Sequence, residues 1–123
     1  MLAVARRGRG NAELCRSKPP YQEWYRKDLG RYIGGPLLTK CNGRYLVGGR
    51  KWENETYRTA LYWLEDKELV PLVELPSDGD NSYPGFIPLG PQRALLSYYS
   101  SHEKDKEGKP ITAIYLVELE IEK

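Results

Sequence analysis

The chain has 123 residues, a length that forms one domain at most and buries roughly two thirds of the surface exposed by the unfolded chain. Charged residues make up 29% and apolar residues 40%, which excludes a disordered chain. The net charge of +2 hides a gradient, because residues 1–31 carry eight Lys/Arg against three Asp/Glu, whereas residues 65–123 carry six against twelve.

Short runs rich in β-branched and aromatic residues, separated by Gly, Pro and Asn, predict strands and no helix. Asn42-Gly43 predicts a tight hairpin, because both residues tolerate a positive φ. Further turns are expected at Asp66-Lys67, at 90–92 and at 108–110. Beyond the first 29 residues, the clearest strand-like runs are 36–41, 44–50, 57–65, 69–75, 84–89, 93–100 and 111–121.

The chain also repeats itself. Residues 59–65 return as residues 112–118, 53 positions later, and residues 36–50 return as residues 85–99, 49 positions later. A fainter copy stands at the start of the chain, where residues 2–7 resemble residues 45–50. A period of about 45 to 50 residues built of hairpin-linked strands is typical of propeller blades.

We therefore expect a single all-β domain, a partial β-propeller of about two and a half blades of antiparallel four-stranded sheets. Residues 1–29 would supply the outer strands of one blade, residues 34–75 a full blade, and residues 84–121 three strands of a final blade. Such a segment has open edges and exposed apolar faces. We expect it either to lack N-terminal blades of a larger propeller or to complete itself as a homo-oligomer.

Other partners are less favoured by the sequence. No apolar run exceeds about five residues, far short of the roughly 20 of a membrane-spanning helix. The basic region 1–31 has no stripe of consecutive cations, so solvated surface charge is favoured over nucleic-acid binding. Cys15 and Cys41 are expected to be buried free thiols, with no metal or other cofactor.

The N-terminal segment has no secretory signal, since its apolar residues precede its positive charges. Taken as written, the chain predicts a cytoplasmic protein. Secretion is the alternative if the chain is an N-terminally truncated fragment.

Several motifs resemble one family when they are read in order. Residues 17–24 (SKPPYQEW) keep the spacing of the Asp-box turn, S-x-D-x-G-x-T-W, with its terminal Ser and Trp. Residues 34–36 (GGP), 79–85 (GDNSYPG) and 97–103 (SYYSSHE) follow. Together they resemble the last blades of bacterial sialidase-like (BNR-repeat) propellers. The resemblance implies a carbohydrate-active, glycoside hydrolase-like protein whose partner is a sialoside or a related glycan.

The resemblance also implies roles for individual residues. Sialidases bind the substrate carboxylate with three arginines, and use a tyrosine nucleophile paired with a glutamate and an aspartate as acid/base. Tyr83 stands at the place of the nucleophile and is expected to point to the propeller axis. Arg58 stands at the place of a carboxylate-binding arginine, with Arg50 as a nearby alternative. The same mouth is expected to be rimmed by Tyr98, Tyr99, His102 and Glu103.

The family pattern is incomplete in this chain. The second arginine would fall near Asn11-Ala12, and the remaining catalytic residues would lie upstream of Met1. A tyrosine without its base keeps a pKa near 10 and is a poor nucleophile at neutral pH. We therefore expect an incomplete glycosidase site that is inactive alone, with a non-catalytic glycan- or protein-binding module as the alternative.

Structural roles are the simpler alternative for the same residues. Tyr83 would then be an aromatic residue at a strand start, Arg58 would pair with Glu53 or Glu55, and His102 would lie in a surface loop. The three tryptophans are expected to pack within blades rather than to serve as stacking platforms; they are Trp24, Trp52 and Trp63.

Overall fold

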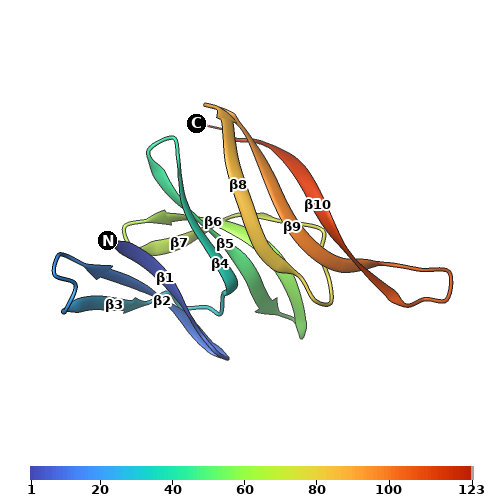
Figure 1. The fold of residues 1–123 in the computed structure, drawn as a ribbon, viewed down its shortest axis with the longest axis horizontal. Coiled ribbons are helices and arrows are strands. Elements are labelled where there is room, and N and C mark those ends of the chain that lie inside the picture. The colour runs from blue at the N-terminus through green and yellow to red at the C-terminus, as the bar shows by residue number, and fades with distance from the viewer. Residues whose placement is uncertain (123) are drawn as a thin grey trace.

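Ten strands in three antiparallel sheets make up the computed structural model, which describes residues 1–122 (Figure 1). The N-terminal sheet contains β1 (Leu2–Arg7), β2 (Gly10–Ser17) and β3 (Trp24–Asp28). The middle sheet contains β4 (Gly34–Cys41), β5 (Arg44–Glu53), β6 (Thr56–Glu65) and β7 (Glu68–Glu74). The C-terminal sheet contains β8 (Ser82–Gly90), β9 (Arg93–Lys104) and β10 (Pro110–Glu120).

The all-β prediction is thus confirmed, and the strand bounds agree with the predicted runs to within a few residues. Residues 1–122 contain no helix, and so none that is long and apolar enough to cross a membrane. In each sheet the strands are neighbours in chain order, which short hairpins between antiparallel strands impose.

Two-residue turns with positive φ close three hairpins. Asn42-Gly43 has φ values of 54° and 74°, and Asp66-Lys67 has values of 49° and 65°, so both predicted turns are confirmed. A third turn, Asn54-Glu55, joins β5 to β6 with φ values of 52° and 60°. Because this turn is so tight, β5 runs on to Glu53, three residues past its predicted end, and brings Trp52 into the strand.

The two copies of the sequence repeat form equivalent strands in the middle and C-terminal sheets. β4, β5 and β6 pair in the same antiparallel order as β8, β9 and β10. Val47 and Leu96, which lie 49 residues apart, are both completely buried on the second strand of their sheets. Similar sequences thus fold into similar sheets.

The core lies on both faces of the middle sheet. One cluster joins this sheet to the N-terminal sheet and includes Leu14, Ile33 and Val47. The other joins it to the C-terminal sheet and includes Leu46, Leu61, Trp63, Leu96 and Tyr98. The three sheets therefore form successive layers, and the middle one is covered on both sides.

The predicted burial of the cysteines is confirmed, whereas that of the tryptophans is confirmed only for Trp63. Cys15 and Cys41 are buried free thiols, and Trp63 lies in the core, as predicted. The packing role predicted for Trp24 and Trp52 is wrong, because both rings are exposed to solvent near strand ends, where no neighbouring sheet covers them.

Candidate functional site

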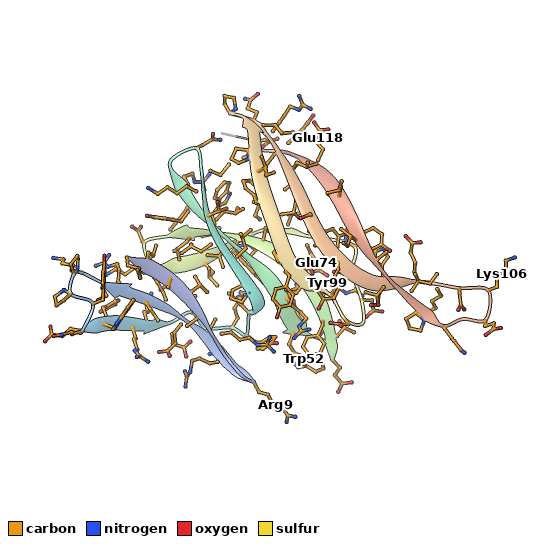
Figure 2. All side chains as sticks on the ribbon, viewed as in Figure 1. Arg9, Trp52, Glu74, Tyr99, Lys106 and Glu118 are labelled. Atoms are coloured by element: carbon orange, nitrogen blue, oxygen red, sulfur yellow. The ribbon has the colours of Figure 1, made fainter. Side chains whose placement is uncertain are left out.

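Four chain segments converge at one end of the middle sheet. They are the turn between β1 and β2, the residues just before β4, the turn between β5 and β6, and the loop leading into β8. Figure 2 shows Arg9, Trp52 and Tyr99 at this end of the molecule, far from Glu118 at the opposite end of the C-terminal sheet. Side chains distant in the sequence are gathered here.

An open groove of about 570 Å³ lies at this end, and we call it the arginine–aromatic groove. Its lining combines three guanidinium groups with three aromatic rings and contains no carboxylate. The lining residues are Arg6, Gly8, Arg9, Tyr32, Arg50, Trp52 and Tyr57. Such a surface suits an anion attached to a ring that can stack on aromatic side chains.

Arg50 is the most enclosed cation of the groove. Its Nη2 donates a hydrogen bond to the Tyr32 hydroxyl at 2.9 Å, and its guanidinium lies 4.5 Å from the centre of the Tyr57 ring. Its Nη1 lies 3.6 Å from Asp80, a long ion pair, and its buried Nε has no hydrogen-bond partner within residues 1–122. Because Nε is shielded from solvent, the Nη groups are the donors that Arg50 presents to a ligand in the groove.

Strand pairing explains why Arg50 lies in the groove and Arg58 does not. Arg50 is paired with Thr59, and Trp52 with Tyr57, whereas Arg58 is paired with Lys51. Since neighbouring residues of a strand point to opposite faces, Arg58 lies on the other face. There it forms an ion pair with Glu74 at 3.6 Å and donates a hydrogen bond to the Ser77 carbonyl, rather than pairing with Glu53 or Glu55.

The aromatic rings of the groove contact one another. The Trp52 and Tyr57 ring centres are 4.6 Å apart, and the Tyr32 and Tyr57 ring centres are 6.1 Å apart. The Arg6 guanidinium lies 5.8 Å from the Tyr32 ring centre. These contacts hold the rings in place before any ligand arrives, which reduces the entropy cost of stacking on them.

Tyr83, Tyr99 and Asp80 continue the site beyond Arg50. The exposed Tyr83 ring stacks on the Tyr99 ring, with centres 6.0 Å apart and planes 18° apart. The Tyr99 hydroxyl donates a hydrogen bond to Asp80 at 2.7 Å, and Asp80 faces Arg50. The structure thus brings together three of the predicted site residues, namely Arg50, Tyr83 and Tyr99.

Burial raises the pKa of the Tyr99 phenol, and the hydrogen bond to Asp80 adds to this effect, so that the pKa reaches about 12. We expect one tyrosine of the native protein to ionise near pH 12, well above the usual value near 10. Phenolate absorbance followed against pH should show this step in the wild type and lose it in Tyr99→Phe.

The same raised pKa fixes the sign of a stability effect. Below pH 10 the Tyr99 phenol is protonated in both the folded and unfolded states, so its full contribution to the free energy of unfolding is present. Between pH 10 and about 12 the Tyr99 phenol ionises in the unfolded state but not in the folded state, so its contribution to the free energy of unfolding is lost as the pH rises. A Tyr99→Phe variant whose stability fell as steeply as that of the wild type over this interval would contradict the assignment.

A buried polar network holds the loop that carries Asp80 and Tyr83. Asn81 is completely buried; its Oδ1 accepts a hydrogen bond from the Thr59 hydroxyl, and its Nδ2 donates to the carbonyls of Tyr57 and Gly79. Ser82 donates a hydrogen bond to the Gly34 carbonyl at 2.7 Å. The loop is therefore fixed to β4 and β6.

The close approach of β4 and β8 requires a glycine. Gly35 has a φ of 55°, and a Cβ atom at this position would stand 2.7 Å from the Ser82 hydroxyl. A side chain here would be strained by the backbone and would also displace Ser82. Gly35 thus allows the loop to reach the groove.

Tyr98, His102 and Glu103 do not rim the same mouth. Tyr98 is only 3% exposed, and its hydroxyl donates to the Pro76 carbonyl. The His102 ring lies 4.6 Å from the Tyr115 ring, and Glu103 accepts a hydrogen bond from the Tyr115 hydroxyl. Tyr98 and Tyr99 are neighbours in β9 and must face opposite ways, so only Tyr99 reaches Arg50.

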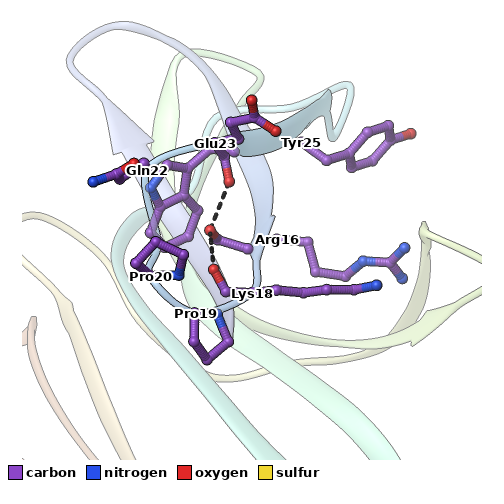
Figure 3. A pocket seen from close by; sticks show the side chains of 9 residues that line it. Arg16, Lys18, Pro19, Pro20, Gln22, Glu23 and Tyr25 are labelled. Atoms are coloured by element: carbon purple, nitrogen blue, oxygen red, sulfur yellow. Dashed lines mark hydrogen bonds between the residues drawn. The ribbon is translucent and has the colours of Figure 1, made fainter.

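A second hollow, of about 650 Å³, lies at the loop between β2 and β3 (Figure 3). There the Ser17 hydroxyl donates to the Glu23 carbonyl at 2.6 Å, and the Trp24 indole donates to the Tyr21 carbonyl at 3.1 Å. These bonds tie the loop to itself, and the lining combines the cations Arg16 and Lys18 with the Glu23 carboxylate, which the other groove lacks. The arginine–aromatic groove is therefore the better candidate for an anionic ligand.

Comparison of the chain with protein-family models, with curated proteins and with solved structures finds no match. The groove is therefore interpreted from its own chemistry. Within residues 1–122 no group of three or more His, Cys, Asp or Glu side chains is placed to hold a metal ion.

Sequence reasoning did not select most of the groove. It left out Arg6, Arg9, Tyr32 and Tyr57, and it assigned Trp52 to packing. One signal was available, because Trp52 lies two residues before Asn54 and Tyr57 two residues after Glu55, so that both aromatic residues flank this turn. The segments that carry Arg6, Arg9 and Tyr32 come together with this turn only in the folded chain.

Proposed function

We propose that this protein is a sialidase-like, propeller-type carbohydrate-binding protein that takes an acidic sugar, of the sialoside class, in the arginine–aromatic groove. The observation that carries the proposal is the lining of that groove, with Arg6, Arg9 and Arg50 beside three aromatic rings. A guanidinium binds a carboxylate through two parallel hydrogen bonds, and an aromatic ring covers the apolar face of a sugar.

The arrangement of the strands supports the propeller part of the proposal. β4 and β8, the first strands of their sheets, contact each other, as the innermost strands of adjacent blades do around an axis. The N-terminal sheet would then supply the outer three strands of a blade, and the C-terminal sheet the inner three.

The turn that resembles an Asp-box adds a second support. Tyr21 occupies the position of the motif's glycine and adopts a φ of 62°, the left-handed conformation that glycine favours. The motif's retained Ser17 and Trp24 both hydrogen-bond to backbone carbonyls of this same turn. These features of the turn support the resemblance to the Asp-box, although its central residues differ.

Binding without turnover is the form of the function that the geometry favours. Asp80 interacts with Tyr99, whose raised pKa of about 12 makes it a poor nucleophile at neutral pH. Within residues 1–122 the Tyr83 hydroxyl has no hydrogen bond to a carboxylate that would act as its base. Tyr83 is then a stacking surface beside the groove rather than a nucleophile.

Titration with 3′-sialyllactose, followed by the fluorescence of Trp52 and by calorimetry, tests the proposal. We expect saturable binding of sialyllactose and much weaker binding of lactose, which lacks the carboxylate, because the arginines provide the discrimination. Trp52→Phe should remove most of the fluorescence change. Equal binding of lactose, or no binding of either sugar, would refute the proposal.

Two further measurements separate this function from its alternatives. Turnover of a fluorogenic sialoside that Tyr83→Phe abolishes would establish catalysis instead of binding. Tighter binding of a single-stranded oligonucleotide, with a steep dependence on salt, would indicate that the groove stacks bases and contacts phosphates.

A further inference from the structure

The outer face of the C-terminal sheet exposes a patch of apolar side chains beside the Arg93–Glu118 ion pair. Ile114 is 79% exposed and Leu116 is 68% exposed, and both point to this face from β10. Leu116 is paired with Ser97, and Ile87 of β8 is paired with Leu95, which places Ile87 and Leu95 on the same face. Contiguous exposed apolar side chains of this kind mark a surface that another molecule covers.

The internal repeat indicates how this face is covered. Leu61 and Trp63 precede Ile114 and Leu116 by 53 residues and occupy the equivalent positions in β6. They are only 0% and 6% exposed, because the C-terminal sheet packs on them. The same face is therefore buried in the middle sheet and open in the last one.

Each sheet has two unlike faces. We call the face that packs on the next sheet in the chain the forward face; in the middle sheet it carries Leu46, Leu61 and Trp63. The backward face packs on the preceding sheet and carries Leu38 and Val47. Two faces stay uncovered, namely the forward face of the C-terminal sheet and the backward face of the N-terminal sheet.

The backward face of the N-terminal sheet suits a close approach. Val4 and Leu14 pack toward the middle sheet, so their strand neighbours Ala3 and Cys15, which are paired with each other, lie on the opposite face, where Ala3 is half-buried and the small Cys15 side chain is covered by its neighbours in the sheet. Arg26 is paired with Cys15 and lies on the same face. By the same pairing Glu13 and Asp28 lie on this face too, so it combines small side chains with charges of both signs.

We propose that a second copy of this chain covers the apolar face head to tail, with the backward face of its N-terminal sheet packed on the forward face of the C-terminal sheet. This contact continues the forward-on-backward packing that already occurs twice within the chain. The overall charge of the two end segments favours their approach, since residues 1–31 carry eight Lys/Arg against three Asp/Glu, whereas residues 82–122 carry four against six.

The number of copies follows from the proposed propeller arrangement, on which this one step rests. Two copies contribute six sheets, within the usual range of about four to eight blades in a closed propeller, whereas three copies would exceed it. A head-to-tail contact either closes into a ring or grows into a filament. We therefore infer a closed pair with two identical contacts.

Native mass spectrometry and light scattering on the 123-residue chain test the pair. We expect twice the monomer mass of 14.2 kDa. Leu116→Glu and Ala3→Arg should each give folded monomers, since Leu116 is exposed and Ala3 is half-buried on an uncovered face of a single copy. As a control, Leu72→Glu changes an exposed leucine on the edge strand β7, away from both faces, and should leave the pair intact.

Mixing the two monomeric variants gives the sharpest result. The Ala3→Arg chain keeps an intact forward face and the Leu116→Glu chain keeps an intact backward face, so the equimolar mixture should form a pair through one contact. A monomeric wild type, a mixture that stays monomeric, or pairs that persist in either variant would overturn the proposal. The sugar-binding test is independent, because the groove is complete within one copy.

Discussion

Arg50→Met is expected to weaken the binding of 3′-sialyllactose by roughly 10- to 100-fold, the loss that follows from removing charge-assisted hydrogen bonds worth about 1.5–3 kcal/mol. Methionine keeps the length and packing of the arginine stem beside Tyr32 and Tyr57 but has no donor for a carboxylate. The change removes the hydrogen bond to Tyr32 and the contact with the Tyr57 ring but also removes the buried, unpartnered Nε, so we expect a loss of stability of about 1 kcal/mol. Calorimetric titration measures the affinity, and thermal denaturation checks the fold.

Arg58→Met is the matched control for this experiment. Both arginines lie at the same end of the middle sheet, but Arg58 is on the opposite face and is engaged with Glu74 and Ser77. We expect its replacement to leave sialyllactose binding within about twofold of the wild type. A loss of binding in Arg58→Met and not in Arg50→Met would show that the ligand lies on the other face of the sheet.

Arg50→Lys separates the effect of charge from that of geometry. Lysine keeps the positive charge but lacks the planar fork that binds both carboxylate oxygens. An affinity between those of the wild type and Arg50→Met is therefore expected. An affinity equal to that of the wild type would show that the groove attracts anions only through its charge.

Asn81→Ala is expected to lower the free energy of unfolding by about 3 kcal/mol, the largest stability effect that we predict for a single polar side chain. The change leaves the Thr59 hydroxyl without its partner in the buried interior, and it removes the donor to the part-buried carbonyls of Tyr57 and Gly79. Urea denaturation of wild type and variant measures the difference.

Asn11→Ala is the corresponding surface control. Asn11 makes one hydrogen bond, to the exposed Asp28 carboxylate, which water can replace. Its loss should cost less than about 0.5 kcal/mol. Similar losses in both asparagine variants would mean that the loop leading into β8 is not held by the buried network.

Binding and assembly use separate parts of the molecule in these proposals. The groove lies where β5 ends and β6 begins, whereas Ile114 and Leu116 lie on the outer face of β10. Tyr83 and Tyr99 connect the two regions, because Tyr99 is paired with Ile114 while its hydroxyl reaches Asp80 beside Arg50. A second copy packed on β10 would therefore lie next to the groove.

The sequence by itself determined the strands, their turns and their repetition. Alternating apolar residues and Asn-Gly or Asp-Lys turns act over a few neighbouring residues, so Asn42-Gly43 and Asp66-Lys67 could be recognised without any tertiary contact. The repeat of 59–65 in 112–118 likewise predicted equivalent strands, which β6 and β10 are. These features depend on local conformational preferences.

Only the tertiary structure decided which side chains share a site. Arg50 rather than Arg58 enters the groove, and Tyr99 rather than Tyr98 reaches Asp80, because strand register and the irregularities in pairing at 34–37 and 82–85 determine the face on which each residue lies. Tyr32, Trp52 and Arg9 meet there only through the packing of one sheet on another. A shift of one residue exchanges the two faces of a strand, and that choice is made by contacts between distant segments rather than by the local sequence.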